Sequence, residues 1–237
     1  MTAFDSAMAA PLADALGRYS LEATALVVTG AGPEVYDFYQ GPLTIGLVPR
    51  EYRQARIALI KKASDFAKTL GIPAFHTHCG FVPENPSDPL YKETVDALCE
   101  VTGYCKANGQ IVLYETGQET PTTMLRYIED VGLDNQFVNL DTANLILYGN
   151  GNPVDALDVI GKLVRGVHAK DGMFPTDPKK LGEEVPIGQG KVDFPKVIRR
   201  LKALGYTGAI TIEREISGPK QVEDIKKEKE YLERLIG

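Results

Sequence analysis

The sequence is poor in the residues on which nucleic-acid and membrane proteins depend. Its 237 residues include no tryptophan and only three histidines, and the charged residues sum to a net charge of −6. A nucleic-acid surface needs clustered lysine and arginine, so this acidity argues against one. No apolar run approaches the roughly 18–20 residues of a membrane-spanning helix. We therefore expect a small-molecule partner, with no nucleic acid and no membrane.

Cysteine is also scarce. Cys79, Cys99 and Cys105 are odd in number and lack the C-x-x-C spacing of metal and redox motifs. Reduced thiols are typical of cytosolic proteins, and no basic segment precedes an apolar stretch at the N-terminus. We expect a cytoplasmic protein, and a 43% hydrophobic content predicts a single domain over residues 1–237 with a substantial core.

What the chain does contain is a regular alternation. Short apolar runs rich in β-branched residues alternate with longer segments whose apolar residues recur every three or four positions. The predicted strands are Leu21–Val28, Ile72–His78, Ile111–Glu115, Phe137–Asp141, Gly166–His168 and Ala209–Glu213. The predicted helices are Tyr52–Leu70, Tyr91–Ala107, Pro121–Val131, Pro153–Leu163, Asp193–Leu204 and Pro219–Leu235. This pattern predicts a parallel α/β sheet, either open and doubly wound or closed into a barrel.

The residues at the predicted strand ends favour the barrel. No G-x-G-x-x-G or G-x-x-x-x-G-K-[ST] motif opens a helix, which removes the usual sign of a nucleotide fold. Glu115, Asp141, His168 and Glu213 each end a predicted strand. In a (β/α)8 barrel the carboxyl ends of all strands meet at one mouth. The pattern predicts a metal site there, although any one strand-ending acid could equally be a solvated loop residue.

The chemistry of these side chains indicates which metal they would hold. Three carboxylates and one imidazole suit Mn²⁺, Mg²⁺ or Co²⁺ better than a thiolate site would, and Zn²⁺ is also compatible with them. We expect a divalent metal cofactor, with Mn²⁺ as the first choice.

Two of the histidines lie close together in the segment FHTHCGFVPENPSD. His76 and His78 flank Thr77 on a predicted strand, so both point to the same face. His78 is the last of them before the turn at Gly80 and is the better placed to bind substrate. The alternative is that His76 is a core histidine and that His78 caps a loop.

Several segments resemble a known family. The segments are THCGFVPENPSDPLY, LYETGQET, NLDTANLILYGNGNPVDAL, VRGVHAKDG, EVPIGQGKVDFPKVI and AITIERE. Together they resemble the xylose isomerase-like TIM barrel family of sugar isomerases and epimerases. In that family a Glu, an Asp, a His and a Glu on successive strands hold a divalent metal. The resemblance assigns the metal to Glu115, Asp141, His168 and Glu213.

The resemblance also implies an activity. Moving a proton next to a ketose carbonyl requires a base, an acid and an electrophile that stabilises the enediolate. Glu115 and Glu213 are the expected acid and base of a metal-dependent sugar isomerase or epimerase. Lys170 and Asp171, in the family string HAKDG, are expected to bind substrate or to orient a metal ligand, and the alternative is a salt bridge within a loop.

Two positions depart from the family pattern. Many relatives carry a histidine three residues after the strand-ending aspartate, where this chain has Asn144. Several epimerases carry an arginine six residues after the metal histidine, where this chain has Phe174. Asn144 can still bind substrate through hydrogen bonds, but neither residue brings positive charge. The identity of the sugar therefore stays open.

The resemblance begins late in the family's fold. Leu21–Val28 resembles the family's third strand, and Pro11–Tyr19 resembles the helix before it. We expect a (β/α)8-type barrel that lacks the first two strands and keeps six βα units. Such a sheet has two exposed edges. We therefore expect an N-terminally shortened barrel and a homo-oligomer in which a partner subunit covers the opening.

Three other functions fit the same fold. An inosose-type dehydratase would begin with the same proton abstraction and then release water. A non-catalytic barrel would bind a sugar without turning it over. A zinc endonuclease of this fold needs a basic groove and more than three histidines, so it fits this composition least well.

Overall fold

A computed structural model describes residue 4 and residues 6–237. Within these residues, six parallel strands form one sheet in the order β1-β2-β3-β4-β5-β8, and β6 pairs with β7 in a separate antiparallel ribbon. The strands are β1 Leu26–Val27, β2 Ala74–Thr77, β3 Ile111–Glu115, β4 Gln136–Asp141, β5 Val164–Ala169, β6 Asp171–Gly172, β7 Glu184–Val185 and β8 Ile210–Ile212.

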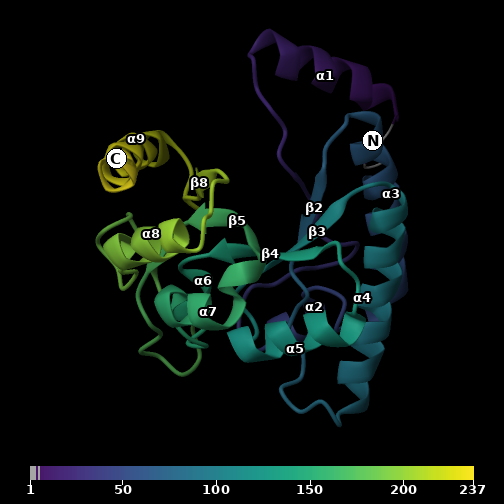
Figure 1. Ribbon diagram of the computed structural model, residues 1–237. Helices are drawn as coiled ribbons and strands as arrows, with labels where there is room; N and C mark the ends of the chain where they lie inside the picture. Colours follow the sequence, from purple (N-terminus) through teal and green to yellow (C-terminus); the bar gives the residue numbers. More distant parts are fainter. Residues whose placement is uncertain (1–3, 5) are drawn as a thin grey trace.

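Helices follow most of the strands and cover the outer face of the curled sheet (Figure 1). The α-helices are α1 Ala9–Arg18, α2 Gly41–Thr44, α3 Arg50–Thr69, α4 Pro89–Ala107, α5 Pro121–Val131, α6 Asn144–Leu147, α7 Pro153–Ile160, α8 Phe194–Ala203 and α9 Pro219–Ile236. Two 3₁₀ turns, η1 Ser6–Met8 and η2 Gly161–Leu163, flank α1 and α7. Thr120 caps α5, because its side chain accepts a hydrogen bond from the amide of Thr123.

The prediction of six parallel strands in a partial barrel is confirmed. The predicted first strand was too long, since only Leu26 and Val27 pair with β2. Leu26 lies opposite Phe75, and β2 begins at Ala74, so residues 21–24 have no neighbouring strand to pair with. Sequence analysis also missed the β6–β7 ribbon and the short helices α2 and α6, which are too short to show a periodic pattern.

The core lies between the sheet and its outer helices. Phe75, Tyr114 and Leu140, from three adjacent strands, are completely buried. The hydroxyl of Tyr114 lies 2.8 Å from that of Thr102 on α4 and donates to Gln136, so this buried polar group is satisfied. The apolar layer holds β2 to β5 rigidly, and these strands carry most of the candidate site.

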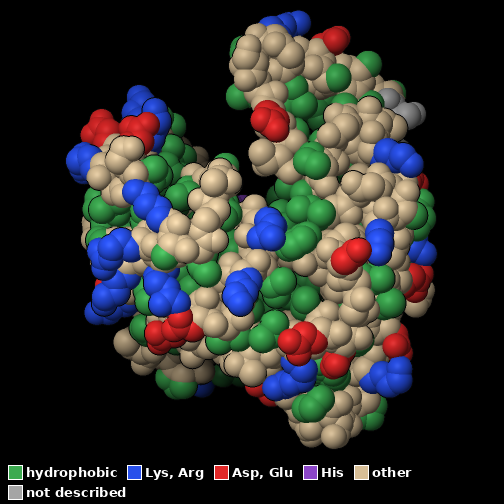
Figure 2. Space-filling view, viewed as in Figure 1, with side chains coloured by type: hydrophobic (Ala, Val, Ile, Leu, Met, Phe, Trp, Pro, Cys, Tyr) green, Lys and Arg blue, Asp and Glu red, His purple; other side chains and the backbone are tan. Residues whose placement is uncertain are grey.

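One side of the barrel is open. β1 and β8 are the two edges of the sheet, and a cavity of about 380 Å³ lies inside the curve, lined by Val27, Leu113 and Thr211 among others. Figure 2 shows this side as a deep notch with α1 on one flank and the C-terminal elements on the other. None of the residues of α1 is buried. Leu12 within this helix and Met8 directly before it are both exposed. Within the described residues, the strands in the middle of the sheet are thus paired on both sides, whereas β1 and β8 are each paired on one side.

The segment of residues 29–49 is held against the mouth of the barrel by close backbone packing. Gly46 and Gly80 both have positive φ, and the two segments that carry them cross closely. A Cβ on Gly46 would collide with the backbone of Cys79, and a Cβ on Gly80 would collide with the backbone of Ile45. Arg56 on α3 is buried and donates hydrogen bonds to the carbonyls of Ala31, Pro33 and Gly46. These contacts fix a segment whose regular structure is limited to the short helix α2.

Across the described part of the chain, no helix combines the length and the apolar composition needed to cross a membrane.

Candidate metal and substrate site

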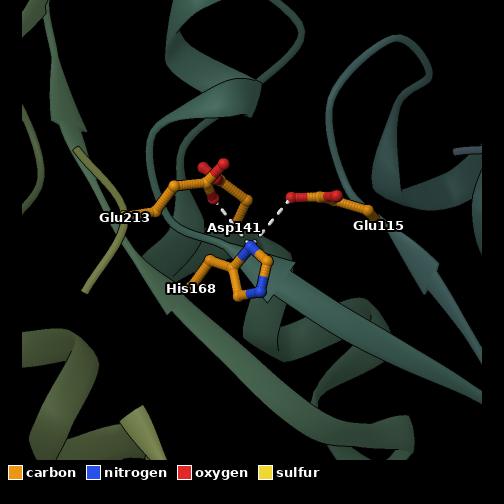
Figure 3. A group of neighbouring side chains, drawn as sticks. All are labelled: Glu115, Asp141, His168 and Glu213. Carbon is orange, nitrogen blue, oxygen red and sulfur yellow. Dashed lines mark hydrogen bonds and ion pairs between the residues drawn. The ribbon is translucent and has the colours of Figure 1, made fainter. Parts of the chain in front are cut away.

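Four side chains meet at the carboxyl ends of neighbouring strands. Glu115 ends β3, Asp141 ends β4, His168 is the penultimate residue of β5, and Glu213 directly follows β8. The strand register aligns them, because Asp141 lies opposite His168 and the amide of Glu213 donates to the carbonyl of Ala169. One ligand atom of each side chain lies within 4.8 Å of the others. In Figure 3, Glu115 and Glu213 approach His168 from opposite sides.

Glu115 is the most heavily surrounded of the four. Its Oε1 lies 3.1 Å from His168 Nδ1, and its Oε2 lies 2.8 Å from His76 Nε2 and 3.2 Å from His78 Nε2. Burial alone would raise the pKa of Glu115, but the three histidines hold it well below its ordinary value. All the histidines of the chain therefore converge on one carboxylate.

His168 is held between two carboxylates. Its Nδ1 lies 2.7 Å from Glu213 Oε2 as well as 3.1 Å from Glu115 Oε1. Burial opposes protonation, but these contacts raise the pKa of His168 to about 10. Glu213 responds in the opposite sense: burial would raise its pKa, yet His168 and Lys170 lower it to about 2. A proton on His168 compensates the carboxylates here, and a bound cation would supply the same charge.

Asp141 has one oxygen in use and one that lacks a partner. Its Oδ1 accepts from the amides of Ala143 and Asn144 at 2.8 and 2.7 Å. Its Oδ2 is buried and, within the described residues, has no hydrogen-bond partner. Lys170 Nζ lies 3.8 Å away. Burial and the neighbouring carboxylates raise the pKa of Asp141 despite this lysine. An oxygen in this position is suited to a metal ion.

A cavity of about 360 Å³ opens above these side chains. Its lining includes the strand-end residues His76, Thr77, His78, Glu115, His168, Lys170, Glu213 and Glu215. The rest comes from β1 and its following loop and from the segments after β3 and β4: Val27, Val28, Thr29, Glu34, Tyr36, Gln118, Asn144, Leu147, Tyr148 and Leu181. The volume is at the lower end of the range for small-molecule sites.

Comparison with known proteins places this arrangement in a family. Residues 3–235 match the xylose isomerase-like TIM barrel family. The chain belongs to this family. The xylose isomerase domain protein from Planctomyces limnophilus is 37% identical, and it superposes with a TM-score of 0.89 over 96% of this chain and 81% of that one. A strand-end site at the mouth of the barrel is where such a fold positions functional groups.

More distant xylose isomerase-like structures share the fold. A D-tagatose 3-epimerase-like protein is 21% identical with a TM-score of 0.75, covering 98% of this chain and 85% of that one. A xylose isomerase-like TIM barrel protein from Mycobacterium smegmatis in complex with magnesium is 19% identical with a TM-score of 0.73, covering 99% and 79%.

One curated relative is also similar in sequence. The uncharacterized protein MJ1311 of Methanocaldococcus jannaschii is 26% identical over 195 residues, or 78% of this chain. The alignment covers 63% of that protein, so the chain spans less than two thirds of its length.

The structure brings most of the predicted site residues of this xylose isomerase-like barrel together. His78 lines the cavity, its Nδ1 is buried without a partner in the described chain, and its ring meets Tyr36 edge-on at 5.7 Å. His76 is more deeply buried and contacts Glu115. Asn144 and Lys170 also line the cavity, and Lys170 Nζ donates to Asn144 Oδ1 at 3.4 Å. Their roles in binding stay predictions.

Asp171 lies elsewhere. Its carboxylate is buried and accepts from the amides of residues 172, 188, 190 and 192. It does not line the cavity, and this geometry gives no support to the predicted contact between Asp171 and substrate. Because these four hydrogen bonds all come from backbone amides, the carboxylate of Asp171 instead orders the loop of residues 187–192.

Sequence reasoning missed four residues of the cavity wall: Glu34, Tyr36, Gln118 and Tyr148. Glu215 also lines the cavity; it is exposed, and its Oε2 lies 3.0 Å from Lys170 Nζ. The segment GPEVYDFY, which contains Glu34 and Tyr36, carried a usable signal. It places two acids and three aromatic residues in the loop after a strand, and such loops form the mouth of a barrel.

Proposed function

We propose that this protein is a divalent-metal-dependent sugar isomerase or epimerase that acts on a ketose or a related sugar. The observation that carries the proposal is the convergence of Glu115, Asp141, His168 and Glu213 within 4.8 Å, at the floor of a cavity of sugar size. Membership of the xylose isomerase-like family and the likeness to a D-tagatose 3-epimerase-like fold support it.

These four residues fit a metal ion. They offer three carboxylates and one imidazole, which is a donor set for Mn²⁺, Mg²⁺ or Co²⁺, with Zn²⁺ also compatible. Asp141 Oδ2 accepts no hydrogen bond from the described residues, so it is available as a metal ligand. The magnesium in the Mycobacterium smegmatis relative supports a hard divalent cation here, and we keep Mn²⁺ as the first choice. When bound, the metal would polarise the substrate carbonyl and stabilise an enediolate.

The proton transfers are assigned to Glu115 and Glu213. The two carboxylates lie on opposite sides of His168, so a substrate carbon above it is accessible to one on each face. One carboxylate would remove the proton next to the carbonyl, and the other would return a proton to the opposite face. This exchange inverts a stereocentre in an epimerase.

The remaining cavity residues would position the substrate. Lys170 is almost completely buried and presents its ammonium toward the carboxylates, where it can donate to a substrate oxygen. Asn144 accepts from Lys170 and fixes its direction. His78 Nδ1 is a buried polar atom that lacks a partner in the described residues and is available to a sugar hydroxyl.

We also propose that the chain forms a single domain whose open side is covered in the active form by a second copy of the chain. The edges β1 and β8 offer unpaired backbone groups, and α1 carries exposed apolar residues beside the notch. Light scattering at dilute concentration tests this, since a stable monomer with full activity would exclude it. The cytoplasmic location stays a prediction, consistent with the free thiols of the three cysteines.

Metal content tests the proposed function most directly. We expect about one divalent ion per chain by inductively coupled plasma mass spectrometry. Glu213→Gln should lose it, whereas Glu215→Gln, two residues further along, should keep it. A ketose screen with the loaded protein should then show turnover that Glu213→Gln abolishes.

The same experiment separates the alternatives. Several Zn²⁺ ions per chain would favour an endonuclease. Release of water from substrate would indicate a dehydratase. A metal-free protein that still binds sugar would indicate a binding barrel.

A further inference from the structure

The charges around the cavity are uneven. The acidic residues of its lining are Glu34, Glu115, Glu213 and Glu215, and Asp141 lies directly beside them. Among the described residues of this lining, Lys170 is the only lysine or arginine. A bound divalent cation would act at the floor of the cavity, where three of these carboxylates converge. The rest of the wall would keep its negative charge.

The ammonium group of Lys170 lies among carboxylates at the floor of the cavity. Its Nζ lies 3.0 Å from Glu215 Oε2, 3.7 Å from Glu213 Oε1 and 3.8 Å from Asp141 Oδ2. The side chain is only 2% exposed and is held in place by its surroundings. It therefore does not reach the far wall of the cavity, which is the loop after β1 that carries Glu34 and Tyr36. The amides of Ala143 and Asn144, at the start of α6, both donate to Asp141 Oδ1 and are also occupied. With three carboxylates around it, Lys170 has no positive charge left to neutralise a phosphate or carboxylate on the substrate, although it can still donate to a neutral hydroxyl.

The far wall carries an acid instead. Glu34 Oε1 accepts from the amide of Gly30 at 2.9 Å, and Glu34 Oε2 lies 3.5 Å from the hydroxyl of Tyr36. Arg56 packs beneath this loop, but its guanidinium donates to three backbone carbonyls and does not line the cavity. The hydrogen bonds that Glu34 accepts come from neutral donors, and the positive charge of Arg56 acts on it from outside the lining of this cavity.

The neighbours of Glu34 are suited to hydroxyl groups. Tyr148 is wedged edge-on between the rings of Phe38 and Phe81, and its hydroxyl accepts from Gln118 Nε2 at 3.2 Å. Phenol and amide groups exchange hydrogen bonds with hydroxyls without requiring a charge on the ligand. The aromatic faces of Tyr36 and Tyr148 add apolar surface, which suits the C–H face of a sugar.

We propose that the substrate is a neutral polyhydroxylated ketose without a phosphate or carboxylate group, and that Glu34 selects against anionic sugars. This inference rests on the proposed function and refines it to a substrate class. Glu34 would accept a hydrogen bond from a hydroxyl at the end of the sugar remote from the metal floor. A phosphate at that end would meet this carboxylate and would find no lysine or arginine beside it in the described lining.

Matched pairs of substrates test this. Metal-loaded protein would be assayed with D-fructose and D-fructose 6-phosphate, and with L-ribulose and its 5-phosphate, measuring kcat/KM for turnover and Kd by calorimetry. For each pair in which at least one sugar binds, we expect kcat/KM and affinity to be at least roughly tenfold higher for the neutral sugar than for its phosphate ester. Equal or better binding or turnover of the phosphate esters would overturn the inference, and so would an absence of binding by every neutral sugar.

Substitution of Glu34 locates the selectivity. Glu34→Gln keeps an oxygen that can accept from the Gly30 amide, so the loop should stay folded, which circular dichroism would verify. It should reduce the preference for neutral sugars by about threefold at low salt and by less at high salt, because screening weakens charge repulsion. Glu129→Gln, which removes the same charge from the exposed face of α5, should leave the preference unchanged. An unchanged preference in Glu34→Gln would show that Glu34 does not set it.

Failure of the two proposals can be told apart. If no ketose is converted but neutral sugars bind in preference to their esters, the proposed reaction fails and the substrate class stands. If the esters are converted, the reaction stands and the substrate class fails.

Discussion

The floor and the far wall of the same cavity are built in different ways. The floor consists of side chains at the ends of hydrogen-bonded strands, where Asp141 and His168 are paired in register. The far wall comes from a loop, at Glu34 and Tyr36, that has no sheet partner and is held by Arg56 and by the glycine crossing at Gly46. A rigid floor suits proton transfer, which needs fixed geometry, and a loop wall suits selectivity, which can change without disturbing the chemistry.

The largest effect is expected at the floor. Glu115→Gln removes a proposed acid or base and the charge that three histidines share. We expect kcat to fall by about 10³-fold, in line with the loss of general acid–base catalysis. Steady-state kinetics on a converted ketose would measure it. Retention of more than a tenth of the activity would remove Glu115 from the mechanism.

The far wall should respond to the loss of its anchor. Arg56→Met removes the donor to three backbone carbonyls, of which that of Gly46 is buried, and this should cost about 2 kcal/mol of unfolding free energy. Urea denaturation would measure the change. Arg50→Met, on the exposed first turn of the same helix, should change stability by less than about 0.5 kcal/mol. Similar losses in the two variants would mean that the loop does not depend on Arg56.

A smaller effect is expected where floor and wall meet. His78→Ala removes a ring that contacts both Glu115 and Tyr36. KM for the sugar should rise by about tenfold, the size of effect expected for one lost hydrogen bond to a buried group, with a smaller change in kcat. Unchanged affinity for substrate would contradict a binding role for His78.

The smallest effect concerns a buried acid beneath the site. Glu119 accepts from the hydroxyl of Tyr127, and burial raises its pKa to about 8 from the ordinary value of 4.5. The unfolded chain releases this proton first as pH rises. The stabilisation is therefore complete below about pH 4.5 and is lost progressively up to about pH 8.

Denaturation across this pH range tests the assignment. Glu119→Gln should remove a slope of about 1 kcal/mol per pH unit from the dependence of unfolding free energy on pH. Turnover should be retained, since Glu119 does not line the cavity. Parallel curves for the variant and the parent protein would show that Glu119 titrates normally.

The parts of the fold that were predicted well are those with strong local signals. The strand Ile111–Glu115 and the helix Pro121–Val131 were predicted with correct bounds, because an apolar run and an N-cap define them locally. β1 was predicted too long, because strand length depends on where the neighbouring strand begins. The far wall was missed, since Glu34 and Tyr36 lie in a segment without periodicity.

The sequence by itself determined the alternation of strands and helices and the four candidate metal ligands, because a strand-ending acid or histidine can be recognised from the residues beside it. Only the tertiary structure decided which other residues reach the cavity. Lys170 and Asp171 are adjacent and both buried, yet one lines the cavity and the other supports a distant loop. Alternation places neighbouring side chains on opposite faces, and only the packing of the whole sheet decides which face is the mouth.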